Sequence, residues 1–183
     1  MTIQNAEGKI LIATPKITGK IFYKSVVYVH TDDDTGSVGV MLNVPMDHDM
    51  AIQWSKDINW YHPDKIFHGG PVERTLGYVI HSNDYGCDSS VQLNQALSYT
   101  GGRTVVDDIN HARGPEQFLL MTGYCQWGPQ QLETEIENDM WIIADFSVEY
   151  FFQDLARDDA WEYSIDLAAL YQSNKLLNMV DNS

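Results

Sequence analysis

The chain has 183 residues, of which 44% are hydrophobic and 11% aromatic, which suffices for one domain that buries about 70% of its unfolded surface. Twenty-six acidic residues against eleven Lys and Arg give a formal net charge of −15, so direct contact with nucleic acid or an anionic bilayer is disfavoured. The composition excludes a disordered chain and predicts a single domain over residues 1–183.

The N-terminus and the cysteines indicate a cellular compartment. Residues 1–9 lack the basic start and apolar run of a signal peptide, and no run of about eighteen apolar residues follows. The two cysteines, Cys87 and Cys125, form no Cys-x-x-Cys pair. We expect a cytoplasmic protein with reduced thiols and no membrane attachment.

Strand patterns dominate the first half of the chain. Residues 9–14 form a short apolar run that ends before Pro15, which lacks an N–H to donate to a neighbouring strand. Residues 25–30 are β-branched and aromatic, and a turn rich in Asp at 31–36 separates them from a second run at 38–45. That order predicts a β-hairpin. Further short strands are expected at 66–68, 76–81 and 91–94.

Helix signals appear between the strands. A short helix is expected within residues 46–65. Thr104 and Asp107 have the cap-plus-acid spacing of a helix start, and this helix would end near Arg113. Residues 117–122 form an apolar run that predicts a buried strand.

The stretch Gly123–Ile136 carries the clearest signature. Gly123 and Gly128 bracket an aromatic segment that we interpret as a loop. Gly128 followed by Pro129 places an N-cap before a proline suited to the first helical position, so a helix is expected to begin near Pro129. Its buried stripe would consist of Leu132, Ile136 and Met140.

The C-terminal part predicts one more strand, at 141–146, and one more helix. Asp159 can cap a helix from Ala160 to about Gln172, with a frayed tail from Ser173. Because no long crossover helix separates the early strands, we expect an α+β fold with a mainly antiparallel sheet. The buried stripe of the helix would consist of Trp161, Ile165, Ala168 and Ala169.

The familiar catalytic and cofactor motifs are missing from the sequence. No G-x-S-x-G nucleophile elbow, P-loop or dinucleotide-binding glycine pattern occurs. The run His68-Gly69-Gly70 is similar to the oxyanion-hole glycines of some esterases, but turn chemistry explains it more simply. The aspartates at 32–34 lack the remaining ligands of an EF-hand. We therefore assign no catalytic residue, no cofactor and no metal site.

Two constellations of Cys and His remain as alternatives. Cys125 could act as a nucleophile if His68 and His81 converge on it in space, which would make the protein a cryptic hydrolase or transferase. A zinc ion would draw on His30, His68 and His81, each at the end of an expected strand. No zinc-ligand spacing supports this, and ordinary hydrogen bonds of strand-end histidines are favoured.

One binding hypothesis follows from the expected helix start. The backbone amides of Gln130 and Gln131, together with the helix dipole, could hold a small anionic ligand. Gly69 and Gly70 could add backbone donors, with His68, His81 or Arg74 alongside. The competing interpretation is that Glu133 in the first turn already satisfies this helix end and that the glycines only form turns.

Several runs, in order from about residue 8 to 146, are shared with one family. They are Leu11-Ile12-Ala13-Thr14-Pro15, Phe22 with Ser25-Val26-Val27-Tyr28, Gly36 with Gly39 and Asn43-Val44-Pro45, His68-Gly69-Gly70-Pro71-Val72, and Gly123-Tyr124-Cys125-Gln126-Trp127-Gly128 with Gln131-Leu132-Glu133 and Trp141. On these runs the chain resembles the AlgH/YqgE family of bacterial cytosolic proteins. It departs from the family pattern at Gly19-Lys20-Ile21, at Val29-His30 and after Trp161.

The resemblance implies a single α+β domain with a coiled, partly barrel-like sheet flanked by helices. It implies no established activity, and a regulatory link of one branch suggests a role in transcription without direct DNA contact. We expect a non-enzymatic cytosolic binding or regulatory protein, with an unidentified protein or small anionic ligand as partner. A scaffold that associates with itself is a third alternative. The expected binding surface comprises His68, Gly69, Gly70, Pro71, His81, Tyr124, Trp127, Gln130, Gln131 and Glu133.

Overall fold

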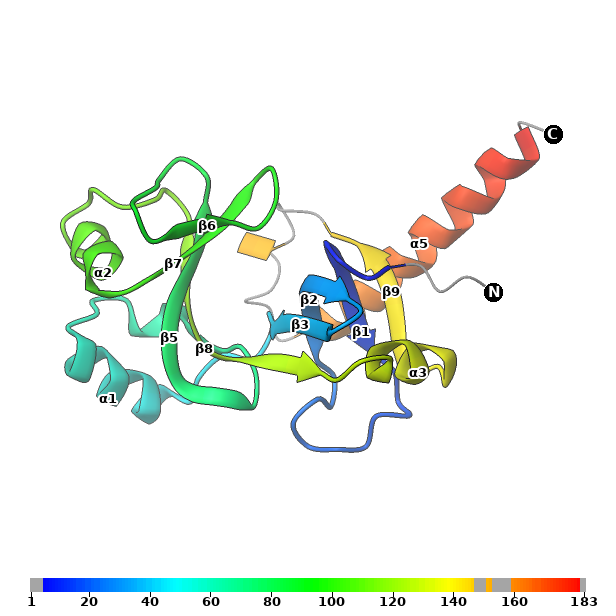
Figure 1. Cartoon of the computed structure of the whole chain (residues 1–183), viewed down its shortest axis with the longest axis horizontal. Helices are drawn as coiled ribbons and strands as arrows, with labels where there is room; N and C mark the ends of the chain where they lie inside the picture. Colours follow the sequence, from blue (N-terminus) through cyan, green and yellow to red (C-terminus); the bar gives the residue numbers. More distant parts are fainter. Residues whose placement is uncertain (1–4, 147–150, 153–158, 182–183) are drawn as a thin grey trace.

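One nine-stranded sheet, curled into a half-barrel, organises the fold (Figure 1). The structure is a computed structural model and describes residues 5–146, 151–152 and 159–181. The strands are β1 (Lys9–Ala13), β2 (Val26–Asp33), β3 (Gly36–Met41), β4 (Ile66–His68), β5 (Val72–Ser82), β6 (Ser90–Gln92), β7 (Leu97–Gly101), β8 (Phe118–Trp127) and β9 (Trp141–Asp145). The helices are α1 (His48–Ile58), the 3₁₀ turn η1 (Pro63–Lys65), α2 (Arg103–Asn110), α3 (Gln131–Glu137) and α5 (Ala160–Asp181).

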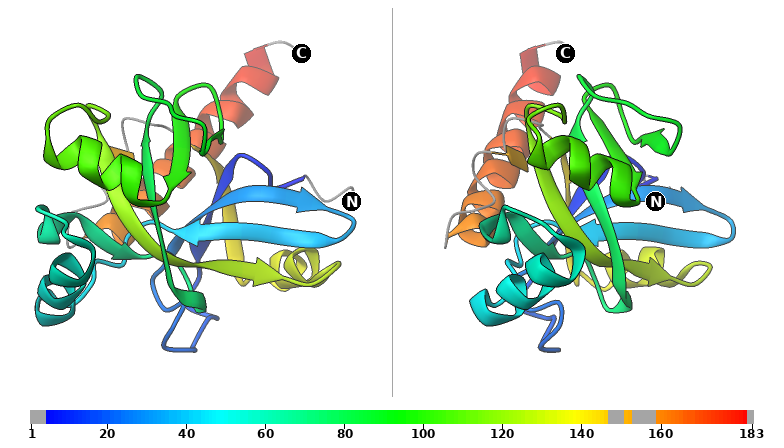
Figure 2. Two further views of the ribbon diagram at one scale, coloured as in Figure 1. Left: turned by 60° about the vertical axis from the view of Figure 1, so that its left-hand side comes forward. Right: turned by 90° about the vertical axis from the view of Figure 1, so that its left-hand side faces the viewer.

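The strand order is β6-β7-β5-β8-β3-β2-β1-β9, and β4 pairs with β8 beside this path. The pairs along the path are antiparallel, and the pair of β4 with β8 is parallel. Helices α1 and α2 lie on one half of the sheet, and α3 and α5 lie on the other (Figures 1 and 2). The expected α+β fold with a coiled, mainly antiparallel sheet is confirmed.

Strand β8 joins the two halves. Its first part pairs with β5 and β4, as in Met121 opposite Tyr78 and Phe67, and its last residues, Cys125 to Trp127, pair with β3. Between these parts Gly123 has a φ of +69°, a left-handed conformation that favours glycine. This residue lets the strand bend from one set of neighbours to the next. The interpretation of Gly123–Gly128 as a loop was therefore wrong, because β8 continues to Trp127. Tyr124 pairs with Val72 of β5, and residues 125–127 pair with β3.

A close crossing of two backbone segments explains the paired glycines after β4. A Cβ on Gly70 would lie 2.1 Å from the carbonyl carbon of Tyr124, and one on Gly123 would lie 2.6 Å from the carbonyl oxygen of Gly70. A Cβ on Gly69 would lie 2.3 Å from the Gly123 carbonyl oxygen. We call Gly69, Gly70 and Gly123 the glycine crossing. Only residues without a side chain allow the end of β4 to approach β8 this closely.

The helix starts differ from the expected ones. Helix α3 begins at Gln131, two residues after Pro129. Its N-cap is Gln130, with a left-handed φ of +61°, so the expected N-cap at Gly128 with Pro129 as the first helical residue was wrong. The helix has seven residues and ends before Met140, which nevertheless packs in the same core cluster as Leu132. Helix α2 is capped by Gly102, which places Thr104 inside the helix and makes its expected capping role wrong.

The other elements follow the sequence patterns more closely. The expected hairpin is formed by β2 and β3, whose pairing extends to Asp33 opposite Gly36. Helix α1 is capped by the side chain of Asp47, which accepts hydrogen bonds from the Asp49 and Met50 amides. Strand β7 was missed, because its sequence LSYTG is mostly polar and pairing with β5 and β6 fixes it.

Side chains in three buried clusters connect the sheet to its helices. One cluster includes Leu11, Trp127 and Leu132 and lies under α3. Another includes Ile80 and extends to α5, and the third includes Val105 of α2 with residues of α1. Burying a Val, Leu, Ile, Phe or Met side chain fully stabilises the folded state by about 1.5–3 kcal/mol relative to leaving it exposed.

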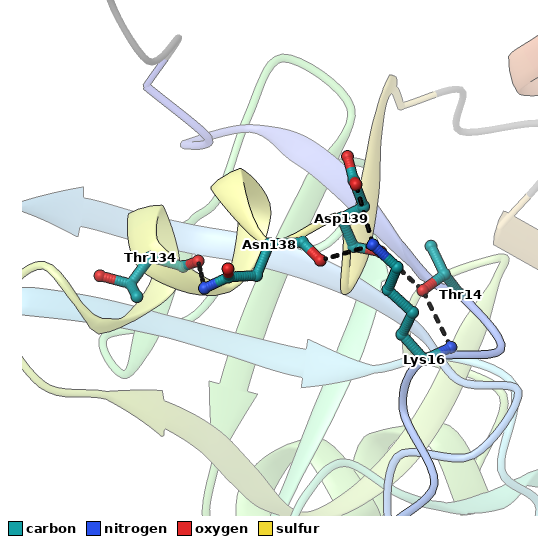
Figure 3. Close-up of polar contacts among 5 residues, drawn as sticks. All are labelled: Thr14, Lys16, Thr134, Asn138 and Asp139. Atoms are coloured by element: carbon teal, nitrogen blue, oxygen red, sulfur yellow. Dashed lines mark hydrogen bonds and ion pairs between the residues drawn. The ribbon is translucent and has the colours of Figure 1, made fainter.

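The turn after α3 is fastened to the residues that follow β1. Lys16 Nζ donates to the carbonyl oxygen of Asn138 at 3.1 Å and pairs with Asp139 Oδ2 at 2.9 Å, and Thr14 Oγ1 donates to the Asp139 carbonyl at 2.7 Å (Figure 3). Asn138 Nδ2 donates to the carbonyl oxygen of Thr134 in the helix itself. These contacts fix where α3 ends relative to β1.

Helix α5 extends nine residues beyond the expected end at Gln172, and its last turns project away from the sheet (Figure 1). Ala160, Ser164 and Ala168 form its buried stripe, and Trp161 Nε1 donates to the Ala13 carbonyl at 2.7 Å. Ala169, expected on that stripe, is exposed. Among the described residues no helix is both long and apolar enough to cross a bilayer.

Candidate functional site

A cavity of about 470 Å³ lies on the inner face of the half-barrel. Pairs of alternate residues on five strands face it, as alternate side chains of a strand point to the same side of a sheet. We call it the tyrosine cavity. It is lined by Tyr28 and His30 of β2, Val38, Gly39 and Val40 of β3, Leu76, Gly77, Tyr78 and Ile80 of β5, Tyr99 and Gly101 of β7, Tyr124 and Gln126 of β8, and Leu93 and Gly102.

The aromatic rings of the tyrosine cavity stand at steep angles to one another. The ring centroids of Tyr78 and Tyr99 are 6.0 Å apart with planes 72° apart, and those of His30 and Tyr99 are 6.0 Å apart with planes 79° apart. The hydroxyl of Tyr78 donates to the Gly123 carbonyl at 2.9 Å, and that of Tyr28 accepts from Asn94 Nδ2 at 3.1 Å. These bonds hold two rings in place, so the shape of the wall is set before any ligand arrives.

The tyrosine cavity is uncharged at neutral pH. In the part of the chain that the structure describes, no Asp, Glu, Lys or Arg lines it. Burial lowers the pKa of His30, with the negative charge of Glu7 opposing this, and burial raises the pKa of Tyr28 and of Tyr78. His30 Nδ1 is buried without a hydrogen-bond partner in the structure. The imidazole is therefore neutral and has hydrogen-bonding capacity left over.

A second, smaller cavity of about 220 Å³ adjoins the first. The two share Gly77, Tyr78 and Gly102, and the smaller one reaches Trp54 of α1 and Arg103 of α2. Arg103 is exposed, so this cavity is open to solvent on the α2 side.

The structure brings together the two segments expected to form the binding surface. Gly69 and Gly70 lie directly against Gly123 and Tyr124, but both are buried. The Gly69 amide donates to the Thr122 carbonyl at 2.7 Å, so it is not free for a ligand. Pro71 is exposed, and His68 lies 3.4 Å from Thr122 Oγ1.

The residues around α3 lie apart from the tyrosine cavity. Trp127 is buried, and its Nε1 donates to Glu135 Oε2 at 2.9 Å. The Gln131 amide donates to the Gly128 carbonyl at 3.0 Å, so one of the two amides proposed to hold an anion is already occupied. Gln130 is exposed and Glu133 is half-buried. A role of these residues in binding stays a prediction.

His81 and Cys125 do not form a catalytic pair. His81 is fully buried, with Nδ1 2.8 Å from the Ser82 carbonyl and Nε2 2.8 Å from Thr100 Oγ1. Since a carbonyl only accepts, Nδ1 donates to Ser82 and Nε2 accepts from the Thr100 hydroxyl. The Cys125 thiol donates to the Gly69 carbonyl at 3.4 Å, and burial raises its pKa to about 12. No hydrogen bond within the described ranges joins Cys125 to a histidine.

The zinc hypothesis also finds no cluster. His30 lines the tyrosine cavity, whereas His68 and His81 bond to Thr122 and Thr100. Nowhere in the described ranges do three or more His, Cys, Asp or Glu side chains gather as a metal site would require.

Sequence reasoning missed most of the tyrosine cavity. Of the expected site residues only Tyr124 lines it, while Tyr28, Tyr78 and Tyr99 were interpreted only as parts of strands or not at all. A signal was present, because Tyr28 with His30 and Tyr78 with Ile80 have the period-two spacing of one strand face. Placing those faces around one space needs the strand order.

Comparison with known proteins gives the family. A family model described as AlgH-like matches residues 10–170. A UPF0301 protein of Rickettsia akari (strain Hartford) is 31% identical over 166 residues, covering 88% of this chain and 87% of the relative. A UPF0301 protein of Rickettsia rickettsii (strain Sheila Smith) is 32% identical over 155 residues, covering 82% of each.

Solved structures share the fold. The solution structure of the AlgH protein from Pseudomonas aeruginosa matches with a TM-score of 0.73 and 25% identity, covering 93% of this chain and 91% of that one. A crystal structure of a Corynebacterium diphtheriae protein matches with a TM-score of 0.67 and 21% identity, covering 86% and 84%. The names of these relatives state no activity or ligand. By sequence model, relatives and fold together, the chain belongs to the AlgH-like family.

Proposed function

We propose that this protein is a non-enzymatic binding protein whose tyrosine cavity takes one small molecule. The observation that carries the proposal is the cavity itself, about 470 Å³ in volume and walled by four tyrosines, a histidine and aliphatic side chains. Cavities of roughly 300–1,000 Å³ with apolar walls and a few polar groups are typical of small-molecule sites.

The polar groups of the wall support binding rather than catalysis. Among the described residues, His30 is the one titratable group in the wall besides the tyrosines, and burial lowers its pKa and so favours its neutral form. Neither Cys87 nor Cys125 lines the cavity beside it. The Cys and His residues of the alternative enzyme hypothesis are engaged in buried hydrogen bonds instead, which favours a structural role for them.

The role that we propose is cytoplasmic and regulatory and does not involve direct contact with DNA, which the net charge of −15 disfavours. In such a role, occupancy of the cavity would change the surface that a protein partner meets. The segment from His68 to Val72 is a candidate for that surface, because its exposed Pro71 adjoins β5, whose residues line the cavity.

The test is a fluorescence titration with N-phenyl-1-naphthylamine, a neutral dye that brightens in apolar sites. We expect one saturable site on the wild-type protein. Tyr99→Leu removes one aromatic wall and is expected to weaken binding roughly fivefold, from about 1 kcal/mol of aromatic contact. Tyr61→Leu is the matched control, because Tyr61 is 61% exposed and lies outside the cavity.

Absence of saturable dye binding to the wild-type protein would overturn the proposal. An equal loss of affinity in Tyr99→Leu and Tyr61→Leu would place the dye elsewhere and would overturn it as well.

A further inference from the structure

The wall of the tyrosine cavity contains four tyrosine rings and, among the described residues, no cationic side chain. Tyr28, Tyr78, Tyr99 and Tyr124 line it, whereas no Lys or Arg does among the described residues. An aromatic ring carries partial negative charge on its face, so several rings around one space attract a positive group. The chemistry of the wall thus favours a cation over an anion.

Tyr99 packs edge to face against two neighbouring rings of the wall. Tyr99 stands at 72° to Tyr78 and at 79° to His30, with both centroid distances 6.0 Å. Rings nearly at right angles can present their faces to one central group from different sides. A cation within about 6 Å of several ring centroids gains from each of them.

The electrostatic field around the tyrosine cavity also favours a positively charged ligand. The carboxylate of Glu7 lies close enough to oppose the effect of burial on His30 and to contribute to the raised pKa of Tyr28. The formal net charge of −15 adds a negative background over the whole molecule. Arg103 lines the smaller neighbouring cavity and not this one.

Hydrogen bonding narrows the kind of cation. A primary ammonium would bring three N–H donors, each of which needs an acceptor, into a wall that consists mainly of aromatic and aliphatic side chains. Buried donors that find no acceptor are costly. A quaternary ammonium has no N–H groups and avoids this cost.

We propose that the tyrosine cavity binds a small organic cation that carries a quaternary ammonium group. The proposal rests on the proposed function, since it names the ligand class of the same site. The volume of about 470 Å³ leaves room for a further part of the ligand beyond the ammonium group.

The test compares choline with 3,3-dimethylbutan-1-ol, an uncharged molecule of the same shape in which carbon replaces the nitrogen. Each is titrated into the full chain, and displacement of N-phenyl-1-naphthylamine is measured. We expect choline to bind at least tenfold more tightly than the alcohol. Tyr99→Phe keeps the aromatic face and should keep the preference, whereas Tyr99→Leu should reduce it at least threefold.

Charge at a distance is tested separately. Glu7→Gln should weaken choline about twofold and leave the alcohol unchanged, and Glu137→Gln, exposed on α3, is the control that should change neither. Folding of each variant is checked by thermal unfolding. If Tyr99→Leu does not fold, Tyr124→Leu replaces a second half-buried wall residue and gives the same comparison.

Equal affinities for choline and the alcohol, or binding of neither, would overturn the proposal. If the dye still binds in that case, the proposed binding function stands and only the ligand class is wrong. If the dye does not bind either, the binding function fails with it. Equal losses of preference in Tyr99→Phe and Tyr99→Leu would also overturn the assignment to the ring face.

Discussion

The glycine crossing and the tyrosine cavity use neighbouring residues of one strand and have opposite packing. Gly123 belongs to the crossing, where an added Cβ would lie 2.6 Å from a backbone oxygen, while Tyr124 lines a cavity of about 470 Å³. At the crossing two backbone segments lie so close that a methyl group does not fit between them. In the cavity, side chains from five strands leave room for a ligand.

The runs shared with the family contribute to both regions, since Tyr28, Gly39, Tyr124 and Gln126 of those runs line the cavity. The runs His68-Gly69-Gly70 and Gly123-Tyr124-Cys125 are conspicuous in the sequence, and their glycines and cysteine serve packing. The cavity is walled by residues that look ordinary one at a time. Perturbing each region should therefore affect different quantities, stability for the crossing and binding for the cavity.

The largest effect is expected at Gly70. A Cβ there would lie 2.1 Å from the Tyr124 carbonyl carbon, in a contact between backbones that no rotamer change relieves. Gly70→Ala should destabilise the protein by about 3 kcal/mol or more, the upper end of the cost of overpacking. Gly101→Ala is the matched control in the cavity wall, since its Cβ would meet nothing within 4 Å. Urea unfolding should leave that variant within about 0.5 kcal/mol of the wild type.

Similar losses in Gly70→Ala and Gly101→Ala would contradict the comparison, because the crossing would then tolerate side chains as well as the cavity does.

A smaller effect is expected at Glu135, which holds the core under α3. Its Oε2 accepts from Trp127 Nε1 at 2.9 Å and from Trp141 Nε1 at 2.8 Å, and its Oε1 accepts from Gln131 Nε2. Glu135→Ala leaves two largely buried indole N–H groups without an acceptor, which should cost about 2 kcal/mol in urea unfolding. Glu137→Ala, exposed on the same helix, should change stability by less than about 0.5 kcal/mol.

Equal stabilities of the Glu135→Ala and Glu137→Ala variants would show that water replaces the carboxylate at the two indoles.

Strand β8 shows how far the sequence predicts the fold. Residues 117–122 have the apolar run of a buried strand, and the structure confirms it. The pattern predicted a loop from Gly123 onward, because a left-handed glycine is typical of turns. What keeps the segment extended is pairing with β3, which lies more than 80 positions earlier in the chain. The local sequence pattern around Gly123 carries no information about this long-range pairing with β3.

The cavity could be predicted even less well. Tyr28 and Tyr78 are each apparent as inward-facing residues only after the strand order β7-β5-β8-β3-β2 is known. The strand β7, which contributes Tyr99, was missed altogether because its sequence is mostly polar. By contrast the glycine crossing could be located by eye, since paired glycines signal a close approach even when the partner is unknown.

A pH dependence of stability should come from the buried histidine next to β7. His81 has a lowered pKa, because burial disfavours its charged form. Below the unfolded-state value near 6.5 the unfolded chain takes up a proton that native His81 does not, so stability falls as pH decreases from about 6.5. The slope from one such group is at most about 1.4 kcal/mol per pH unit.

Thermal unfolding between pH 7.5 and 5.5 measures this slope. His30 and His68, whose pKa values burial also lowers, act in the same direction. His81→Gln should reduce the slope, whereas His48→Gln, exposed at the start of α1, should not. Stability that rises on acidification over this range would show that these histidines gain charge partners instead of losing solvation.

The smallest effect on stability, together with a clear chemical difference, is expected for the two thiols. Cys125 bonds to Gly69 of the crossing, and burial raises its pKa to about 12, so little thiolate forms and reagents do not reach it. Cys87 is half-buried on the loop between β5 and β6, and a hydrogen bond from Ser89 lowers its pKa.

With 5,5′-dithiobis(2-nitrobenzoic acid) at pH 7.5, one thiol should react in the native protein and the second only in urea. Cys87→Ser should remove the native reaction and leave stability within about 0.5 kcal/mol. A native reaction that survives this substitution would mean that Cys125 becomes exposed by local opening, and the crossing would then be a dynamic contact between strands instead of a closed one.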